Sequence, residues 1–418
     1  MKEAKVFDRE VLLGELAESV KDLWKSAADG KPDFLTVWSA EERKEAGDRI
    51  NLRMDQLKEV FQSYPRPFWA VWQRRKWKSR VEAMLREMLW EEPLLEMEKA
   101  MTGERFDAFL SETKAFLRMA RDFDPDLKPE DMGQAVRNYM VYAIFLELNG
   151  KAQKCKPSIF GYSMLYPYTD NYIDSTERTE EEKEHYNRMI AGKIRGEIPE
   201  IISHHEKKTA ELLAGIEADY ARPDEIFEGL LYMLEAQRES QKQTDGRLNL
   251  SEEDILDISV YKGGLSVLID RYFADHPLTG RDLLFYYGFG FLLQLCDDLQ
   301  DIAQDGQEGS RTVFSICDSK EETVRKVNRL LNFTEHLFEL CDTLSEQFRR
   351  FLFQNCCLLI LFSAEGSREY MTEEWLDWAE ERLPVSVDFM GKIKTGFSEK
   401  EAGADKKYGK MMDLLIRP

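Results

Sequence analysis

Apolar residues recur along most of the chain at spacings of three, four and seven, the period at which side chains share one face of an α-helix. The clearest case lies between residues 324 and 344, where the apolar positions are Val324, Val327, Leu331, Phe338, Cys341 and Leu344. Similar patterns occupy residues 81–101, 107–120, 134–148, 225–243, 281–305 and 345–363. The sequence contains no convincing pair of alternating strands and no internal repeat, so we predict an all-α fold.

Two short segments interrupt these helical patterns. Residues 122–131 contain two prolines among acidic residues, and residues 149–157 form a second break. Their short length is expected for connections between helices of one compact bundle and not for linkers between independent domains. We therefore predict a helical core over residues 131–418, with residues 1–130 as an N-terminal helical segment packed on it.

Length and composition narrow the class of protein. With 418 residues, 43% of them hydrophobic, the chain can bury a large core. Its formal charge of −21 disfavours nucleic-acid binding, which needs a basic face. Six cysteines without a C-x-x-C spacing, and an N-terminus without the apolar segment of a signal peptide, favour a reducing, cytoplasmic location. The most apolar stretch, residues 356–362, is too short to span a bilayer, so we expect no transmembrane segment.

One basic cluster differs from the rest of this acidic chain. Two tryptophans, Trp72 and Trp77, are interleaved with five basic residues, namely Arg74, Arg75, Lys76, Lys78 and Arg80. Such a cluster could attract an anionic diphosphate. It could also be a solvated helix face whose long side chains cover apolar surface, and we favour this second interpretation.

The strongest chemical signal is the predicted helix over residues 285–305. Its first half is almost entirely apolar, and its second half carries four acids, Asp297, Asp298, Asp301 and Asp305. At about 100° per residue, these carboxylates and the amide of Gln294 occupy roughly a quarter of the helix circumference. Like charges at this spacing repel each other, whereas Mg²⁺ binds carboxylate oxygens. A solvated acidic helix end is the alternative, but the preceding apolar run indicates a buried helix and favours a metal site.

The run that begins at Gln294, Q-L-C-D-D-L-Q-D, resembles the second aspartate-rich motif (D-D-x-x-D) of trans-prenyl diphosphate synthases, the polyprenyl synthetases of the class I isoprenoid synthase superfamily. The tetrapeptide from Gly309 to Thr312 resembles the Gly-Lys/Arg-Thr that often follows this motif. The resemblance implies a large antiparallel helical bundle, here with an extra N-terminal helical layer. It also implies that the motif holds Mg²⁺ against an allylic prenyl diphosphate, with two or three ions bound together with the substrate.

A second, weaker motif lies upstream in the sequence YSMLYPYTDNYIDS. Asp170 and Asp174 are four residues apart and so share a helix face, and Glu177 joins them only if the helix continues past a capping box that begins at Thr179. The segment resembles the first D-D-x-x-D motif of the family, with Asn171 in place of the second aspartate. Its spacing also resembles the D-x-x-x-D of squalene and phytoene synthases.

A third element, ISVYKGGLSVLID, places Lys262 before two glycines in an apolar helical run. A Gly-Gly pair inside a helix costs about 2 kcal/mol relative to two alanines, so we expect a kink or a close approach of substrate there. The element resembles the Lys-Thr kink of the family, with Gly263 in place of threonine, which implies that Lys262 binds the diphosphate. The alternative is a lysine that simply reaches solvent.

The resemblance sorts the candidate site residues into groups. The candidate metal ligands are Asp170, Asp174, Asp297, Asp298 and Asp301. The candidate donors to the diphosphate are Lys262 and Arg311. The other substrate-binding candidates are Arg178, Tyr232, Gln237, Gln241 and Gln294. Aromatic candidates for the wall of an apolar cavity, each of which also suits an ordinary core position, are Phe160, Tyr166, Tyr261, Phe285, Tyr286 and Phe289.

Departures from the family leave several functions open. The G-K-R-x-R-P segment that binds isopentenyl diphosphate is absent, as are the paired arginines after the first motif and the N-S-E motif of plant and fungal cyclases. We predict a Mg²⁺-dependent enzyme acting on prenyl diphosphates, foremost a chain-elongating prenyltransferase. A homodimer is a possible oligomeric state. The alternatives are a terpene cyclase, a squalene-type head-to-head condensing enzyme, and a non-catalytic regulatory subunit whose site has decayed.

Overall fold

The computed structural model describes residues 6–65, 69–92, 95, 97–173, 175, 177–275, 278, 280–341, 345–386 and 389. Across these residues the chain forms helices joined by short connections, and none of them lies in a β-strand, which confirms the all-α prediction. No helix within these ranges is long and apolar enough to cross a membrane.

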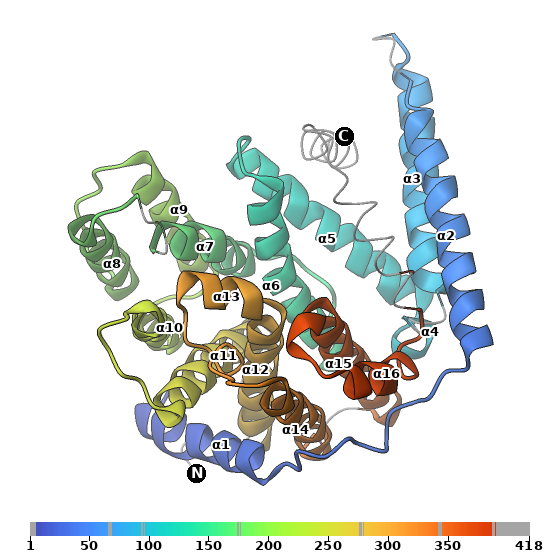
Figure 1. Ribbon diagram of the computed structural model, residues 1–418. Helices are drawn as coiled ribbons and strands as arrows, with labels where there is room; N and C mark the ends of the chain where they lie inside the picture. Colours follow the sequence, from blue (N-terminus) through green and yellow to red (C-terminus); the bar gives the residue numbers. More distant parts are fainter. Residues whose placement is uncertain are drawn as a thin grey trace.

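The described residues form sixteen α-helices, which Figure 1 labels in chain order. The first eight are α1 (Ala17–Ser26), α2 (Ala40–Gln62), α3 (Val71–Glu91), α4 (Met97–Ala100), α5 (Gly103–Phe123), α6 (Pro129–Leu148), α7 (Pro157–Ile173) and α8 (Glu180–Arg195). The last eight are α9 (His204–Asp219), α10 (Ile226–Ser240), α11 (Glu252–Ala274), α12 (Gly280–Gln300), α13 (Ile302–Glu308), α14 (Lys320–Glu339), α15 (Glu346–Gly366) and α16 (Glu373–Glu380). A π-helical turn (Val11–Leu16) precedes α1, and 3-10 turns follow α10 (Gln241–Thr244) and α15 (Arg368–Tyr370).

The helical periods in the sequence locate most of these elements. The patterns over residues 107–120, 134–148 and 345–363 lie within α5, α6 and α15. The pattern over residues 81–101 does not correspond to a single helix, because α3 ends at Glu91 and a new helix begins only at Met97. In the sequence Pro93 stands between these two helices, and a residue that precedes proline avoids the helical conformation.

The capping box predicted at Thr179 is present. The Thr179 hydroxyl accepts a hydrogen bond from the backbone N–H of Glu182 at 3.2 Å, and the Glu182 carboxylate accepts one from the backbone N–H of Thr179 at 2.8 Å. These bonds satisfy N–H groups at the start of α8 that have no partner within the helix. α7 and α8 are therefore separate helices, and Glu177 does not extend the helical face that carries Asp170.

The two helices at the centre of the molecule, α11 and α12, pack directly against each other (Figure 1). α11 is unbroken along its length, so the glycine pair does not end the helix. The glycines instead permit close packing. A Cβ atom added at Gly263 would lie 2.6 Å from the carbonyl oxygen of Gly290, and one added at Gly290 would lie 2.0 Å from the carbonyl oxygen of Gly263. No other residue type fits this contact, which accounts for glycine in spite of its poor helix propensity.

Other helices complete the core around this pair. α6, α7 and α10 pack against α11, while α14 and α15 pack against α12. α1 belongs to the same core, because the ring of Trp24 contacts those of Phe291 and Phe333 at centroid distances of 5.8 and 6.0 Å. α2 and α3, in contrast, pair with each other at the edge of the molecule (Figure 1). The first 130 residues thus contribute both to the core and to its periphery, and the domain boundary at residue 130 stays a prediction.

A buried polar network joins α6, α7 and α11. Asn138 donates from Nδ2 to Oδ2 of Asp270 at 2.8 Å, and the hydroxyl of Ser163 donates to Oδ1 of Asn138 at 2.7 Å. Asp270 is buried, and this burial raises the pKa of its carboxyl well above the usual value. Burial therefore favours a protonated carboxyl, against the opposing effect of the bond from Asn138, and the network fixes the relative positions of three helices around the centre of the molecule.

We expect Gly290→Ala to destabilise the protein by about 1–3 kcal/mol, because the added methyl group would collide with the backbone of α11 and force the central helices apart. Gly133→Ala is the matched control. Gly133 also lies within a helix, α6, but a Cβ atom there meets nothing within 4 Å, so the substitution should be neutral or stabilising by up to about 1 kcal/mol. Chemical denaturation of both variants tests this, and equal effects would contradict the close packing.

Candidate functional site

The acidic segment lies where α12 ends and α13 begins. Asp301 interrupts the helix, a break that the sequence pattern does not predict. The backbone keeps its helical hydrogen bonds across the break, because the N–H of Asp301 donates to the carbonyl of Asp297 at 2.9 Å and that of Asp305 to the carbonyl of Asp301 at 2.8 Å. At the same point the hydroxyl of Ser367, 68 residues further along the chain, donates to the carbonyl of Leu299 at 2.8 Å. The aspartates therefore keep nearly helical spacing on a segment that the C-terminal part of the core holds in place.

Asp298 is the most buried of these acids, with 4% of its surface exposed. Its Oδ1 atom accepts a hydrogen bond from Nε2 of Gln294 at 2.8 Å, but its buried Oδ2 atom has no hydrogen-bond partner. Burial above all, together with the charges of Asp305 and Asp297, raises the pKa of Asp298 to about 7, against the opposing effects of Gln294 and Lys262. A buried oxygen without a donor is costly, so this atom is suited to a cation or a donor that binds later.

Asp305 lies one helical turn beyond the break. The hydroxyl of Thr312 donates to its Oδ2 atom at 3.0 Å. Burial raises the pKa of Asp305 to about 6, and the neighbouring charge of Asp301 acts in the same direction. Thr312 belongs to the tetrapeptide singled out in the sequence, and the backbone of Arg311 in that tetrapeptide is tied to Gln243, which follows α10, by bonds of 2.9 and 3.0 Å. Among the described contacts, threonine and not arginine links this loop to the acids.

Two basic residues from other helices act on Asp297 and Asp301, which reach solvent although protein surrounds part of each carboxyl. Burial raises the pKa of both carboxyls, while the positive charge of Arg137, on α6, lowers them. Lys262, on α11, lowers the pKa of Asp297 as it does that of Asp298. The structure thus brings Lys262 and the second motif together. Arg137 was not among the predicted site residues, because its local sequence does not distinguish it and only the packing of α6 places it near these acids.

The first motif lies at the end of α7. Asp170 is partly buried and lines a cavity of about 60 Å³ between α7, α8 and α10, together with Tyr166 and Gln237. Asp174 lies outside the described residues. Asn171 donates from Nδ2 to Oδ1 of Asp131 at 2.8 Å. An aspartate at position 171 would therefore place two carboxylates in contact, which gives Asn171 a structural reason to differ from the family motif.

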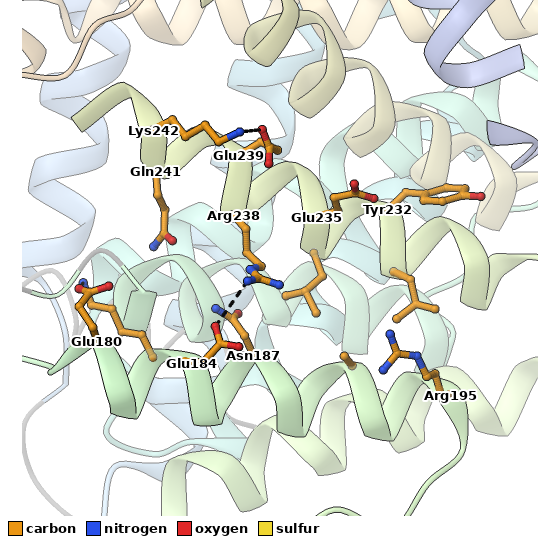
Figure 2. Close-up of a pocket in the computed structure, with 14 residues that line it drawn as sticks. Glu180, Glu184, Asn187, Arg195, Tyr232, Glu235, Arg238, Glu239, Gln241 and Lys242 are labelled. Carbon is orange, nitrogen blue, oxygen red and sulfur yellow. Dashed lines mark hydrogen bonds and ion pairs between the residues drawn. The ribbon is translucent and has the colours of Figure 1, made fainter. Parts of the chain in front are cut away.

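A larger cavity of about 640 Å³ lies between α8 and α10, and Gln241 and Tyr232 line it (Figure 2). Both acidic and basic side chains line it, and Arg238 reaches across it to Glu184 at 3.5 Å. The described contacts of Gln241 do not extend to the aspartates of the second motif. Gln237 and Gln241, one helical turn apart on the sequence, thus face different cavities.

The remaining candidates have other surroundings. Arg178 pairs with Glu182 at 3.3 Å and lies over the ring of Tyr172, with 4.9 Å between the guanidinium carbon and the ring centroid, at the start of α8. Phe285 and Phe289 are buried in the core. The other buried or partly buried aromatic candidates are Phe160, Tyr261 and Tyr286. Of the six predicted wall residues, only Tyr166 is found lining a described cavity, while Phe285, Tyr286 and Phe289 pack against the rings of other core residues.

The donor chemistry of the acidic segment suits a hard divalent cation. Carboxylate oxygens are the ligands that Mg²⁺ prefers, and the unpartnered Oδ2 of Asp298 is available to such an ion. Within the described ranges, however, no three histidine, cysteine, aspartate or glutamate side chains form a group that could hold a metal ion on their own. Any ion bound here would therefore need further oxygen ligands, from substrate phosphate, from water or from side-chain movement.

Comparison with known proteins adds no relative to this picture. No protein-family model matches the sequence, and no curated protein or solved structure matches it either. The resemblance to class I isoprenoid synthases therefore depends on the motifs and on the contacts described above.

We expect Asp298→Asn to stabilise the metal-free protein, and more so as pH rises. Because the folded-state pKa of Asp298 is raised from 3.8 to about 7, its contribution to stability is complete below about pH 4 and is lost as pH rises to about 7. Such a shift corresponds to at most about 4 kcal/mol, or about 4 °C in Tm for a chain of this length.

Thermal melts in a metal chelator between about pH 5.5 and 8 would measure this effect. The exposed Asp377 on α16 provides the matched control, Asp377→Asn, which should follow the wild-type profile. A constant difference between Asp298→Asn and wild type across this range would show that Asp298 is not a desolvated carboxyl.

Proposed function

We propose that this protein is a Mg²⁺-dependent enzyme of the class I isoprenoid synthase type, which ionises an allylic prenyl diphosphate. The observation that carries the proposal is the buried Oδ2 atom of Asp298, which has no hydrogen-bond partner in an acidic segment that also faces Lys262. Carboxylates that only repel each other would be unfavourable in such a site. A divalent cation would relieve the repulsion and satisfy the open oxygen.

In this proposal Asp297, Asp298 and Asp301 would hold Mg²⁺, and Asp170 with Asp174 would form the second metal-binding group. Bound Mg²⁺ supplies positive charge that neutralises the departing diphosphate. The family bundle with an additional N-terminal layer is part of the same proposal, and the all-helical architecture supports it.

Residues around the acids position them and add charge. Gln294 holds one oxygen of Asp298, and Thr312 holds one oxygen of Asp305, so that the other oxygens stay available. Lys262 and Arg137 would contribute positive charge to a bound diphosphate, as their effects on the pKa of Asp297 indicate. Asp298 itself is withdrawn from water, which strengthens every electrostatic interaction at this point.

Chain-elongating transfer is the reaction that the second motif and Lys262 favour, with cyclisation and head-to-head condensation as alternatives. A non-catalytic subunit with a decayed site is a second candidate function. It is favoured by the bond from Asn171 to Asp131 and by the lack of a three-ligand metal group among the described side chains. The two experiments that follow separate these possibilities.

Mg²⁺ and inorganic pyrophosphate should stabilise the protein more together than either does alone, because the ion and the anion complete each other's binding site. When the ligand concentration is one hundred times Kd, binding stabilises the folded protein by about 2.7 kcal/mol, or about 3 °C in Tm. Thermal melts with each component and with both test this. A Tm that does not move with the pair, or with a prenyl diphosphate analogue, favours the decayed site.

Incubation with geranyl, farnesyl or geranylgeranyl diphosphate, with and without isopentenyl diphosphate, should give products that mass spectrometry can identify. Longer diphosphates that need isopentenyl diphosphate indicate elongation, whereas hydrocarbons or alcohols from the allylic substrate alone indicate cyclisation or condensation. Asp298→Ala should reduce turnover at least about a thousandfold, since it removes a ligand of the Mg²⁺ that would neutralise the departing diphosphate. Asp377→Ala, which changes an exposed acid on α16, should not. Normal turnover by Asp298→Ala would refute the proposed mechanism.

A further inference from the structure

The hairpin formed by α2 and α3 is held together by its own small core. Trp77 is buried, donates from Nε1 to the carbonyl of Val60 at 2.6 Å, and contacts the rings of Phe61 and Tyr64 at centroid distances of 6.0 and 5.0 Å. Val81 completes this core. In Figure 1 the two helices lie side by side at the right of the molecule, and the end at which α2 finishes and α3 begins extends away from the central helices. The hairpin thus presents this end, which we call the hairpin tip, on a packed support.

Large apolar side chains are exposed at the hairpin tip. Trp69 is 72% exposed, Trp72 is 78% exposed and Val71 is 55% exposed. Another tryptophan of the hairpin, Trp77, shows that the fold can bury this residue type only a few positions away. Neighbouring exposed apolar side chains commonly mark a surface that another structure covers. Tryptophan in particular is enriched where apolar and aqueous phases meet, because its ring is apolar and its N–H is polar.

Positive charge lies directly behind these apolar side chains. Arg75 and Lys76 follow Trp72 by three and four residues on α3, so they share its outward helix face, and both are exposed. Lys78 is on another side of α3, where its pKa is lowered by burial and by the charges of Lys114 and Arg118 on α5.

The sign of this charge is opposite to that of the whole chain. Between residues 58 and 80 the sequence contains seven basic residues and one acidic residue, in a protein with a formal charge of −21. The basic residues of this stretch are Lys58, Arg66, Arg74, Arg75, Lys76, Lys78 and Arg80. A local excess of cations on an otherwise acidic protein orients it, because an anionic surface attracts only this end and repels the remainder.

The order of these groups along α3 identifies the partner. Trp72 and Val71 lie at the outer end, and at 1.5 Å per residue Arg75 and Lys76 follow about 5–6 Å behind, with Arg80 about 12 Å behind. Apolar side chains that lead and cations that follow match the layers of a membrane surface, in which the acyl boundary lies beneath anionic headgroups. A nucleic-acid site would instead need cations along the whole contact.

We propose that the hairpin tip binds the surface of a membrane that contains anionic lipids, with Trp69, Val71 and Trp72 inserted at headgroup level and Arg75 and Lys76 on the lipid phosphates. This attachment would be from one side of the membrane and would not require a spanning segment. This inference does not depend on the proposed enzymatic function, because it involves none of the residues of the acidic site.

Sedimentation of the full-length protein with vesicles tests the proposal. Wild type should bind vesicles made of equal parts of phosphatidylglycerol and phosphatidylcholine, bind phosphatidylcholine vesicles much more weakly, and lose affinity as salt is raised. The double variant Arg75→Gln/Lys76→Gln should bind the anionic vesicles about 25-fold more weakly, since each cation near such a surface contributes about fivefold. Trp69→Ala/Trp72→Ala should weaken binding about tenfold or more and abolish any shift of tryptophan fluorescence.

Matched controls remove similar groups elsewhere. Ile198→Ala/Ile202→Ala deletes two exposed apolar side chains, and Lys44→Gln/Lys207→Gln removes two exposed cations, one of them at the other end of α2. Both should bind as wild type does, and thermal melts of all variants confirm that they fold. Absence of wild-type binding to anionic vesicles, or equal losses in the controls, overturns the proposal. Tighter binding to single-stranded nucleic acid that the hairpin-tip variants abolish would assign this surface to nucleic acid and also overturn it.

Discussion

The backbone contact between α11 and α12 is the constraint on which the candidate site depends. Gly263 and Gly290 allow the two helices to meet with no side chain between them, and this fixes how far each can slide along the other. A Cβ atom at Gly263 would also lie only 2.8 Å from Cβ of Gln294. Lys262 immediately precedes Gly263, and Gln294 lies one helical turn before Asp298. The same contact therefore determines that Lys262 is the cation that faces Asp298. The position of α11 along α12 therefore determines both how the two helices pack and which charges lie near Asp298.

The two buried aspartates near this contact differ in the charges around them. Each has one oxygen bonded to a side-chain amide, Asp270 to Asn138 and Asp298 to Gln294, and each has a second buried oxygen without a hydrogen-bond partner. Asp298, however, lies among other acids, and the charges of Asp305 and Asp297 add to the effect of burial on its pKa. Proteins retain such arrangements where binding, and not folding, supplies the missing interaction. The neighbouring acids, and not the unbonded oxygen alone, are therefore the physical basis for regarding the end of α12 as a site.

The sequence predicted what local periodicity and local chemistry determine. It predicted the helical class, most helix positions, the capping box at Thr179 and the buried approach of the acidic segment. It could not predict that Arg137 lies beside Asp297, since no local signal separates that arginine from any other exposed one. It also missed the packing role of the Gly263 pair, for which it expected a kink or a close approach of substrate, because helix propensity measures the cost of glycine but not the neighbouring helix that requires it. Which cavity Gln241 faces depends likewise on the pairing of α8 with α10.

The bond from Ser367 to the carbonyl of Leu299 has a consequence for the order of events during synthesis. The acidic end of α12 leaves the ribosome 68 residues before the hydroxyl that supports it. α1, synthesised long before α14, must also wait for Phe333 of that helix before the ring contact of Trp24 is complete. A nascent chain therefore carries these aspartates without this support until Ser367 has been synthesised.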